Sequence, residues 1–217
     1  MMLQLPLGET TLFEGITQLL PGHYLDLKLD TFSQDQTQKC YWEVEYQRDF
    51  DHDEKYFLEH LEELFEESIN LHCRSDVPIG GYVSGGIDSS LVSIAASDIS
   101  SDFVGFTGKF EDLSGYDESQ YAVRAAEKGN FELYQRSISP QDFLDNFSKI
   151  IYHLDYPIAG PGSFPQYMVS ELASNHRKVV LGGQGGDEIF GGYTRYLVAY
   201  LEPVSYTHLT LPTNREV

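Results

Sequence analysis

The stretch IGGYVSGGIDSS, residues 79–90, decides the fold of this chain. An apolar run from Ile79 to Val83 is typical of a short buried strand, and helical periodicity follows the two glycines. Glycines between a strand and a helix let successive N–H groups point at phosphate oxygens from a helix N-terminus with partial positive charge. The sequence therefore predicts an anion-binding loop, with hydroxyl donors at Ser84, Ser89 and Ser90.

Strand-length and helix-length segments alternate downstream of this loop. The predicted strands are 79–83, 103–107, 131–137 and 178–181, and the predicted helices are 89–97, 118–128, 139–154, 164–174 and 196–202. Ser139 and Pro140 form a helix-start signal, and Pro203 is expected to end the last helix. Helices between short strands imply a parallel sheet, so we expect a doubly wound α/β domain in which 178–181 is a buried strand.

The upstream residues follow other patterns. Alternation over residues 24–29, after the turn Pro21-Gly22, and again over 40–42 predicts the last strands of an antiparallel unit. Apolar residues spaced three to four apart over 58–69, with glutamates between them, predict an amphipathic helix with an acidic outer face. We expect a short β remnant at 1–48, an α/β domain at 49–202 and a tail at 203–217 that resembles a translated adaptor sequence.

The charge balance limits the classes of partner. Among 217 residues, 34 are acidic and 14 are lysine or arginine, which gives a net charge of −20. Such a field repels phosphate backbones and anionic lipid, so we expect neither nucleic acid nor membrane as a partner. Cys40 and Cys73 form no metal or redox motif, and the chain start has no hydrophobic signal core. A cytoplasmic setting fits these observations best.

A second glycine loop follows the predicted strand 178–181. Its sequence is GGQGGDE, residues 182–188. In a parallel sheet both loops emerge at the carboxyl edge, where ligands of this architecture bind. Asp88 and Asp187 could then share one Mg²⁺ over a pyrophosphate. Because neither loop has the lysine of the GxxxxGK[ST] motif, kinase and GTPase interpretations lose most of their weight.

These motifs together resemble the synthetase domain of glutamine-hydrolysing asparagine synthetases. The resemblance covers about Asp49 to Glu202 and rests on SGGIDSS, FTGKF (106–110), Asp117-Glu118, residues 153–173 and GGQGGDEIFGGY (182–193). Upstream, residues 11–30 and KCYWEV (39–44) look like the closing strands of that family's class II glutaminase domain. The implied fold is an ATP pyrophosphatase domain of the adenine nucleotide alpha-hydrolase type.

The resemblance implies ATP-dependent synthesis of asparagine. Aspartate is adenylated to β-aspartyl-AMP with release of pyrophosphate, and ammonia derived from glutamine then displaces AMP. ATP and Mg²⁺ are the implied cofactors, with Asp88 and Asp187 as metal ligands. Arg195 is a candidate to reach a phosphate, although a surface ion pair is about equally compatible. The implied nucleotide contacts are Val83, Ser84, Gly85, Gly86, Asp88, Ser89, Ser90, Gly108, Gly182 and Gly183.

Several positions depart from the family pattern. Gln184, a candidate catalytic residue, stands where many members have a glutamate, and an amide cannot accept a proton as a base. Gly182 replaces a serine or threonine, and Gly108 replaces a small apolar residue. The chain begins with Met1 and lacks the N-terminal cysteine nucleophile of class II glutaminases, so we expect a fragment of a longer enzyme.

Two alternatives stay open: adenylation of a different carboxylate, and a fragment that binds nucleotide without turnover. The sequence decides neither the acceptor acid nor the assembly, for which a homodimer is one option.

Overall fold

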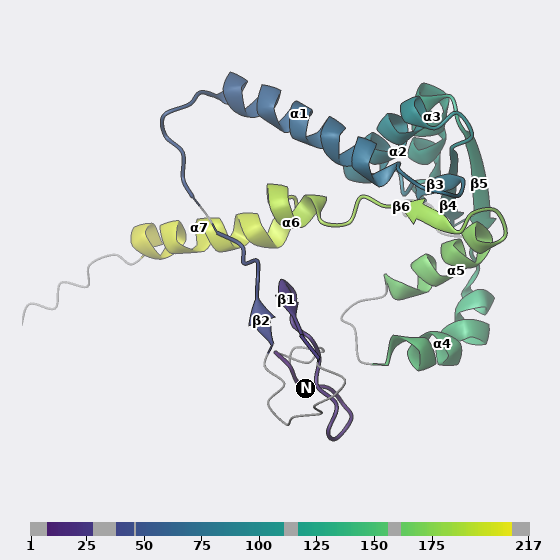
Figure 1. Ribbon diagram of the computed structural model, residues 1–217, viewed down its shortest axis with the longest axis horizontal. Coiled ribbons are helices and arrows are strands. Elements are labelled where there is room, and N and C mark those ends of the chain that lie inside the picture. Colours follow the sequence, from purple (N-terminus) through teal and green to yellow (C-terminus); the bar gives the residue numbers. More distant parts are fainter. Residues whose placement is uncertain (1–7, 28–37, 46, 111–116, 156–161, 210–217) are drawn as a thin grey trace, which may run out of the picture. The chain divides into compact units, whose positions relative to one another are not determined.

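The computed structural model describes residues 8–27, 38–45, 47–110, 117–155 and 162–209, with side chains described as far as residue 202 (Figure 1). The chain forms two compact units. One comprises Met1–Leu64 and Ser139–Tyr167, and the other comprises Phe65–Ile138 and Met168–Val217. Both predicted glycine loops belong to the second unit.

The second unit is built on a parallel sheet. Its strands are β3 (Ile79–Tyr82), β4 (Val104–Lys109), β5 (Glu132–Ser137) and β6 (Val179–Leu181), in the spatial order β5-β4-β3-β6. Helix α2 (Ile87–Ile99) connects β3 to β4, and α3 (Ser119–Gly129) lies between β4 and β5. Every neighbouring pair of strands is parallel, which confirms the α/β class.

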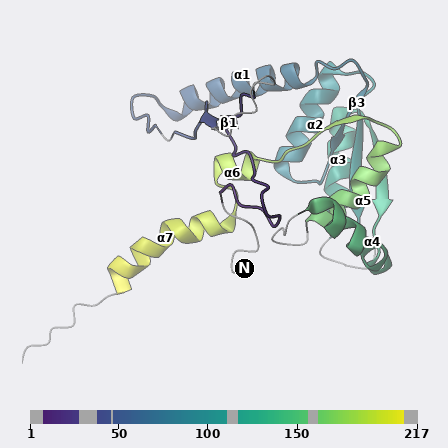
Figure 2. The same ribbon diagram turned by 60° about the horizontal axis from the view of Figure 1, so that its bottom comes forward.

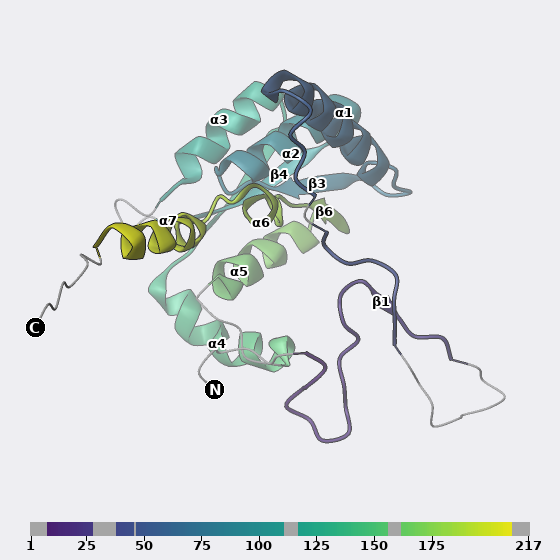
Figure 3. The same cartoon turned by 90° about the vertical axis from the view of Figure 1, so that its left-hand side faces the viewer.

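Helices cover both faces of this sheet (Figure 2, Figure 3). Successive strand side chains point to opposite faces, so Phe103 and Phe106 enter different layers. Phe103 packs in a cluster with Ile79 and with Ala96 of α2, whereas Phe106 packs with Val169 of α5 (Ser163–Ser174). The arrangement is therefore doubly wound, as the sequence predicted. Clusters on the α2 and α3 face also include Val83, Ala122 and Ala125.

Three elements of the second unit differ from the sequence prediction. Strand β6 is not buried, because it lies at a sheet edge, and Val179 is 37% exposed. A short helix, α6 (Gly186–Phe190), follows the second glycine loop and was not predicted. Helix α7 (Thr194–Leu209) continues past Pro203, so the predicted end at this proline is wrong. An interior proline removes one N–H from the ladder and crowds the carbonyl four residues earlier, and helix α7 continues despite both effects.

In the other unit, β1 (His23–Tyr24) and β2 (Lys39–Cys40) pair antiparallel, with His23 opposite Cys40. Residues 28 and 29 of the predicted strand lie outside the described residues. Beyond β2, the N–H groups of Tyr41 and Trp42 both donate to the Gly22 carbonyl, so a turn contact replaces the predicted strand at 41–42. The sequence thus overestimated the length of both strands.

Helices α1 (Glu54–His72) and α4 (Pro140–Leu154) confirm their sequence predictions. Ile69 is the buried residue of α1, and the glutamates of this helix are exposed. At the start of α4 the Ser139 hydroxyl accepts from the Asp142 N–H at 3.2 Å, and the Asp142 carboxylate accepts from the Ser139 N–H at 2.8 Å. Among the described residues, no helix is both long enough and apolar enough to span a bilayer.

Candidate functional site

The first glycine loop makes a tight turn that only a residue without a side chain fits. Gly85 has φ +94°, and a Cβ there would lie 2.8 Å from the Glu118 carbonyl oxygen and 2.9 Å from Cβ of Tyr121. Helix α2 begins directly after this turn, and its N-cap residue, Gly86, provides no side-chain hydrogen bond. Among the described residues no side chain caps the first N–H groups of α2, an arrangement typical of an anion site at a helix start.

The serine hydroxyls of this loop bond mainly within it. The Ser84 and Ser89 hydroxyls lie 2.9 Å apart, and the Ser89 hydroxyl accepts from the Ser84 N–H at 3.2 Å. Ser89 is buried and also donates to the Gly86 carbonyl at 3.2 Å. Ser90 is half-buried, and its N–H donates to that same carbonyl. In this structure Ser84 and Ser89 thus hold the loop in shape, a positioning role that the sequence did not reveal.

The second glycine loop touches the first through its main chain. A Cβ on Gly183 would lie 2.5 Å from the Ser89 nitrogen and 2.8 Å from the Asp88 carbonyl carbon. The Asp88 carboxylate lies directly against Gly186. Because Gly183 and Gly186 have no side chains, the loops after β3 and β6 meet at the carboxyl edge of the sheet, as the sequence predicted.

The two candidate metal ligands occupy different surroundings. Asp88 is half-buried beside the second loop, while the Asp187 carboxylate lies against Gly192, beyond the end of α6. Within the described ranges there is no group of three or more His, Cys, Asp or Glu side chains placed to hold a metal ion. The loops are adjacent, but a metal shared by Asp88 and Asp187 stays a prediction.

Gly182 and Gly108, two glycines that depart from the family pattern, each lie close to a neighbouring side chain. The amide oxygen of Gln184, at the end of a flexible and exposed side chain, lies in the space that a Cβ on Gly182 would take. A Cβ on Gly108 would lie 2.8 Å from Cδ1 of Ile138, so a larger residue there would require the Ile138 side chain to shift. Val83 is fully buried, backbone included, and its N–H donates to the Phe106 carbonyl, so in this structure the residue is not exposed to a ligand.

Three side chains at and after the end of the second loop, those of Glu188, Tyr193 and Arg195, contact one another in series. The Tyr193 hydroxyl donates to Glu188 Oε1 at 2.7 Å, and the Arg195 guanidinium lies 3.8 Å from the centre of the Tyr193 ring. The Tyr193 hydrogen bond lowers the pKa of Glu188, and the same interaction raises the pKa of Tyr193. Sequence reasoning named Arg195 but missed Glu188 and Tyr193, whose spacing across Gly191-Gly192 gave no periodic signal.

Asp117 orders the start of α3, next to the residue that Gly85 contacts. Its carboxylate accepts from the Ser119 N–H at 3.2 Å and from the Ser119 hydroxyl at 3.0 Å. These two hydrogen bonds hold the pKa of Asp117 below its usual value. The Asp117-Glu118 pair therefore supports the first loop, because Asp117 orders the start of α3 and the Glu118 carbonyl lies against Gly85.

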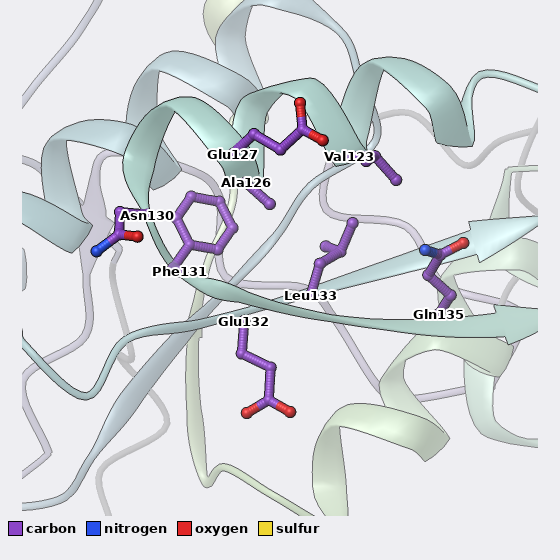
Figure 4. Close-up of a pocket in the computed structure, with 8 residues that line it drawn as sticks. All are labelled: Val123, Ala126, Glu127, Asn130, Phe131, Glu132, Leu133 and Gln135. Atoms are coloured by element: carbon purple, nitrogen blue, oxygen red, sulfur yellow. The ribbon is translucent and has the colours of Figure 1, made fainter.

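A shallow depression of about 400 Å³ lies elsewhere, between α3 and the first half of β5 (Figure 4). It involves the amino end of β5 and none of the candidate site residues. It is lined by Val123, Ala126, Glu127, Asn130, Phe131, Glu132, Leu133 and Gln135.

Two glycine loops in main-chain contact at the carboxyl edge of a parallel sheet define an α/β domain of the doubly wound class. The family model for asparagine synthase matches residues 60–210. The chain belongs to the asparagine synthase family.

Curated relatives carry related names. The chain is 33% identical over 196 residues to asparagine synthetase [glutamine-hydrolyzing] 1 of Bacillus subtilis (strain 168), covering 90% of this chain and 30% of that protein. It is 30% identical over 227 aligned residues to amidase chyE of Penicillium rubens, covering 95% and 33%. The chain thus spans about a third of the length of these relatives.

Among solved structures, an NH3-dependent NAD synthetase from Campylobacter jejuni gives a TM-score of 0.40 at 19% identity, covering 65% of this chain and 61% of that one.

Proposed function

We propose that this chain supplies the ATP-binding part of an asparagine-forming amide synthetase. In the proposed reaction, aspartate is adenylated by ATP to β-aspartyl-AMP, pyrophosphate leaves, and ammonia derived from glutamine displaces AMP. The observation that carries the proposal is the main-chain contact between Gly183 and Ser89, which joins the two loops that bear the family's motifs. A cytoplasmic setting, which supplies ATP and glutamine, belongs to the same proposal.

The first loop suits a triphosphate tail. The uncapped N–H groups at the start of α2 provide donors, and the turn at Gly85 and Gly86 lets phosphate approach the backbone. Gly108, Gly182 and Gly183 would contribute backbone groups around the nucleotide, with Val83 supporting the loop from the core. Ser90, whose side chain is half-buried at the first turn of α2, remains a candidate donor beside Ser84.

The carboxylates of Asp88 and Asp187 would hold Mg²⁺. Asp88 fits this role because its carboxylate lies against the backbone of the second loop, and carboxylate oxygens are the ligands that this hard cation prefers. When bound, Mg²⁺ neutralises the charge of the leaving pyrophosphate.

Gln184 and Arg195 would act close to the reacting groups. Gln184 is exposed and can hydrogen-bond to an incoming nucleophile, but it cannot remove a proton from it. Arg195, oriented by the Tyr193 ring, would place a permanent positive charge near a phosphate.

A second candidate function is adenylation of a carboxylate other than that of aspartate. Gln184 favours it, because a changed group in the second loop alters what the site can do to the nucleophile. The similarity to a protein named amidase chyE is compatible with a different acceptor. A third candidate is nucleotide binding without turnover.

Calorimetry with the full chain tests the nucleotide site. We expect Mg²⁺-dependent ATP binding that is at least about tenfold weaker, roughly 1.4 kcal/mol, in Asp88→Asn and in Asp187→Asn. Asp98→Asn, an exposed change on the same helix as Asp88, should bind like the wild type. Wild-type protein that binds no ATP would contradict the nucleotide site, and unchanged binding by Asp88→Asn would contradict its metal role.

Exchange of labelled pyrophosphate into ATP separates the three candidates. Exchange that requires aspartate supports asparagine formation, and exchange that requires another acid supports the second candidate. Nucleotide binding without any exchange supports the third.

A further inference from the structure

Helix α6 is short and has no core contact of its own. It comprises five residues, Gly186–Phe190, and none of them is buried. Its two large apolar side chains are exposed, Ile189 by 76% and Phe190 by 63%. Because isolated helices shorter than about 12 residues are marginal in water, the hydrogen bonds around α6 decide whether this segment keeps its shape.

The main chain after α6 folds back onto Asp187 in a turn at Gly191-Gly192, the two-glycine turn. Gly191 ends the helix in a left-handed conformation, with φ +69°, and its N–H donates to the Asp187 carbonyl. The Gly192 N–H donates to the same carbonyl at 3.0 Å. The Asp187 carboxylate lies against Gly192, in space that a side chain would take. The two-glycine turn therefore borders both the carbonyl and the carboxylate of Asp187.

Tyr193, the residue after this turn, closes it. Its hydroxyl donates to Glu188 Oε1 at 2.7 Å, five positions back along the chain. Within the described ranges, this is the one hydrogen bond between a side chain of α6 and a side chain outside the helix. Hydrogen bonds to an ionised carboxylate are about twice as strong as neutral ones. Because the two-glycine turn lies between the ends of this bond, the bond restricts where the turn can lie.

The ring of Tyr193 has a separate contact. The Arg195 guanidinium lies 3.8 Å from the centre of the Tyr193 ring and 5.4 Å from that of the Tyr196 ring. Tyr193→Phe keeps a ring beneath the guanidinium and loses only the hydrogen bond. Tyr196→Phe is the matched control, because the described residues provide no hydrogen-bond partner for its hydroxyl.

We propose that Tyr193 is the positioning residue of the second loop. Through its hydrogen bond to Glu188 it holds the two-glycine turn against Asp187, and it thereby restricts the Asp187 carboxylate to one position. Glu188 serves in this arrangement as the acceptor of that bond and not as a second metal ligand. The consequence for Mg²⁺ and ATP rests on the proposed function, whereas the order of α6 does not depend on it.

Amide hydrogen exchange of the ligand-free full chain, followed by NMR, tests the hydrogen bond itself. The Ile189 and Gly192 N–H groups report on α6, because both donate to main-chain carbonyls at its start. In Tyr193→Phe they should exchange roughly two- to tenfold faster, as expected for the loss of one hydrogen bond. Tyr196→Phe should exchange like the wild type, and Tm should be unchanged in both variants because the opening is local.

Two results of this experiment would overturn the proposal. One is an unchanged exchange rate in Tyr193→Phe. The other is a wild type in which the Ile189 and Gly192 amides exchange as fast as those of an unstructured chain, because α6 would then have no order for Tyr193 to maintain.

The acceptor can be tested independently of the donor. Glu188→Ala should raise the exchange rates as much as Tyr193→Phe does, and the double variant should exceed neither, because all three lose the same bond. Glu188→Gln keeps an oxygen that accepts from the Tyr193 hydroxyl, so it should retain most of the wild-type protection. Additive effects in the double variant would show that the two side chains act separately, against the proposal.

Calorimetry connects the hydrogen bond to the proposed metal ligand. Tyr193→Phe and Glu188→Ala should weaken Mg²⁺-dependent ATP binding by at least about threefold, and Glu188→Gln should stay within about twofold of the wild type. A loss in Glu188→Gln as large as that in Glu188→Ala would make Glu188 a metal ligand and refute its assigned role. Faster exchange with unchanged Mg²⁺-dependent binding would refute the link to Asp187.

The two kinds of measurement keep the proposed function and this inference apart. A wild type that binds no ATP would contradict the proposed function, and the exchange rates of the ligand-free chain would still decide whether Tyr193 orders α6.

Discussion

Gly85 combines a left-handed backbone conformation with close neighbours, and the two effects can be separated. We expect Gly85→Ala to lower the free energy of unfolding by about 1–3 kcal/mol for the backbone strain and by about 1–3 kcal/mol more for the contact with Glu118 and Tyr121. Gly191→Ala is the matched control, because Gly191 has φ +69° and a Cβ added there would meet nothing within 4 Å. Urea unfolding measures both. Equal losses would mean that the close contact contributes nothing.

Ser93 has a buried hydroxyl for which the described part of the chain provides no hydrogen-bond partner. We expect Ser93→Ala to leave stability unchanged or to raise it by about 1 kcal/mol, because the alanine has no polar group left unsatisfied. Ser97, one turn later on α2, donates to the carbonyls of Ile94 and Gly129 at 2.7 and 2.9 Å. Ser97→Ala should therefore lose about 1 kcal/mol. Thermal unfolding of both variants checks the contrast, and a destabilised Ser93→Ala would contradict it.

Individual side-chain directions were the least predictable part of the candidate site. The pattern SGGIDSS located the loop, but nothing in it distinguishes a serine that faces a ligand from one that bonds within the loop, as Ser89 does. The position of Gln184 over Gly182 and the stacking of Arg195 on Tyr193 are also three-dimensional contacts. Local spacing contains no information about either.

At the scale of elements, the start of α4 was predictable because its signal is local. Ser139, Pro140 and Asp142 are neighbours in sequence, and their capping box depends on nothing distant. We expect Ser139→Ala to lower stability by about 1 kcal/mol, because the Asp142 N–H loses its acceptor. Differential scanning calorimetry measures the change.

The matched control for this cap is Ser148→Ala, an exposed change in the interior of the same helix. Alanine is the better helix former there, so this variant should be as stable as the wild type or slightly more stable. A loss in Ser148→Ala as large as that in Ser139→Ala would assign the effect to the helix in general rather than to its cap.

The sequence-based predictions of elements were wrong where contacts between distant parts of the chain determine the outcome. The apolar run before Gly182 predicts a buried strand, yet β6 lies at the sheet edge, and only the spatial strand order reveals this. Pro203 predicted a helix end, but α7 continues to Leu209. Helix α6 is too short to show a period of its own, so no sequence window could detect it.

At the scale of the whole molecule, the alternation of strands and helices predicted the parallel sheet and both of its helical layers. The order β5-β4-β3-β6 was not predictable, because it places β6 next to β3, about a hundred positions earlier in the chain. The main-chain contact between the two loops follows from that order. The sequence therefore predicted which loops meet at the carboxyl edge of the sheet but not how closely they approach.

The net charge of −20 makes a prediction about salt. Because self-repulsion opposes the folded state and is screened by ions, we expect Tm to rise between about 0.1 M and about 1 M sodium chloride, by roughly 2–4 °C for each kcal/mol of repulsion removed. Potassium chloride should give the same rise, since screening depends on ionic strength. A Tm that stays constant or falls would show that favourable ion pairs outweigh the repulsion.

The absence of a side chain at Gly183 has a mechanical consequence. With backbone seated on backbone, the turn after β6 and the first turn of α2 cannot slide past each other without breaking contact along both. A displacement of one turn is therefore transmitted to the other, so we expect these two segments, which are far apart in sequence, to move together.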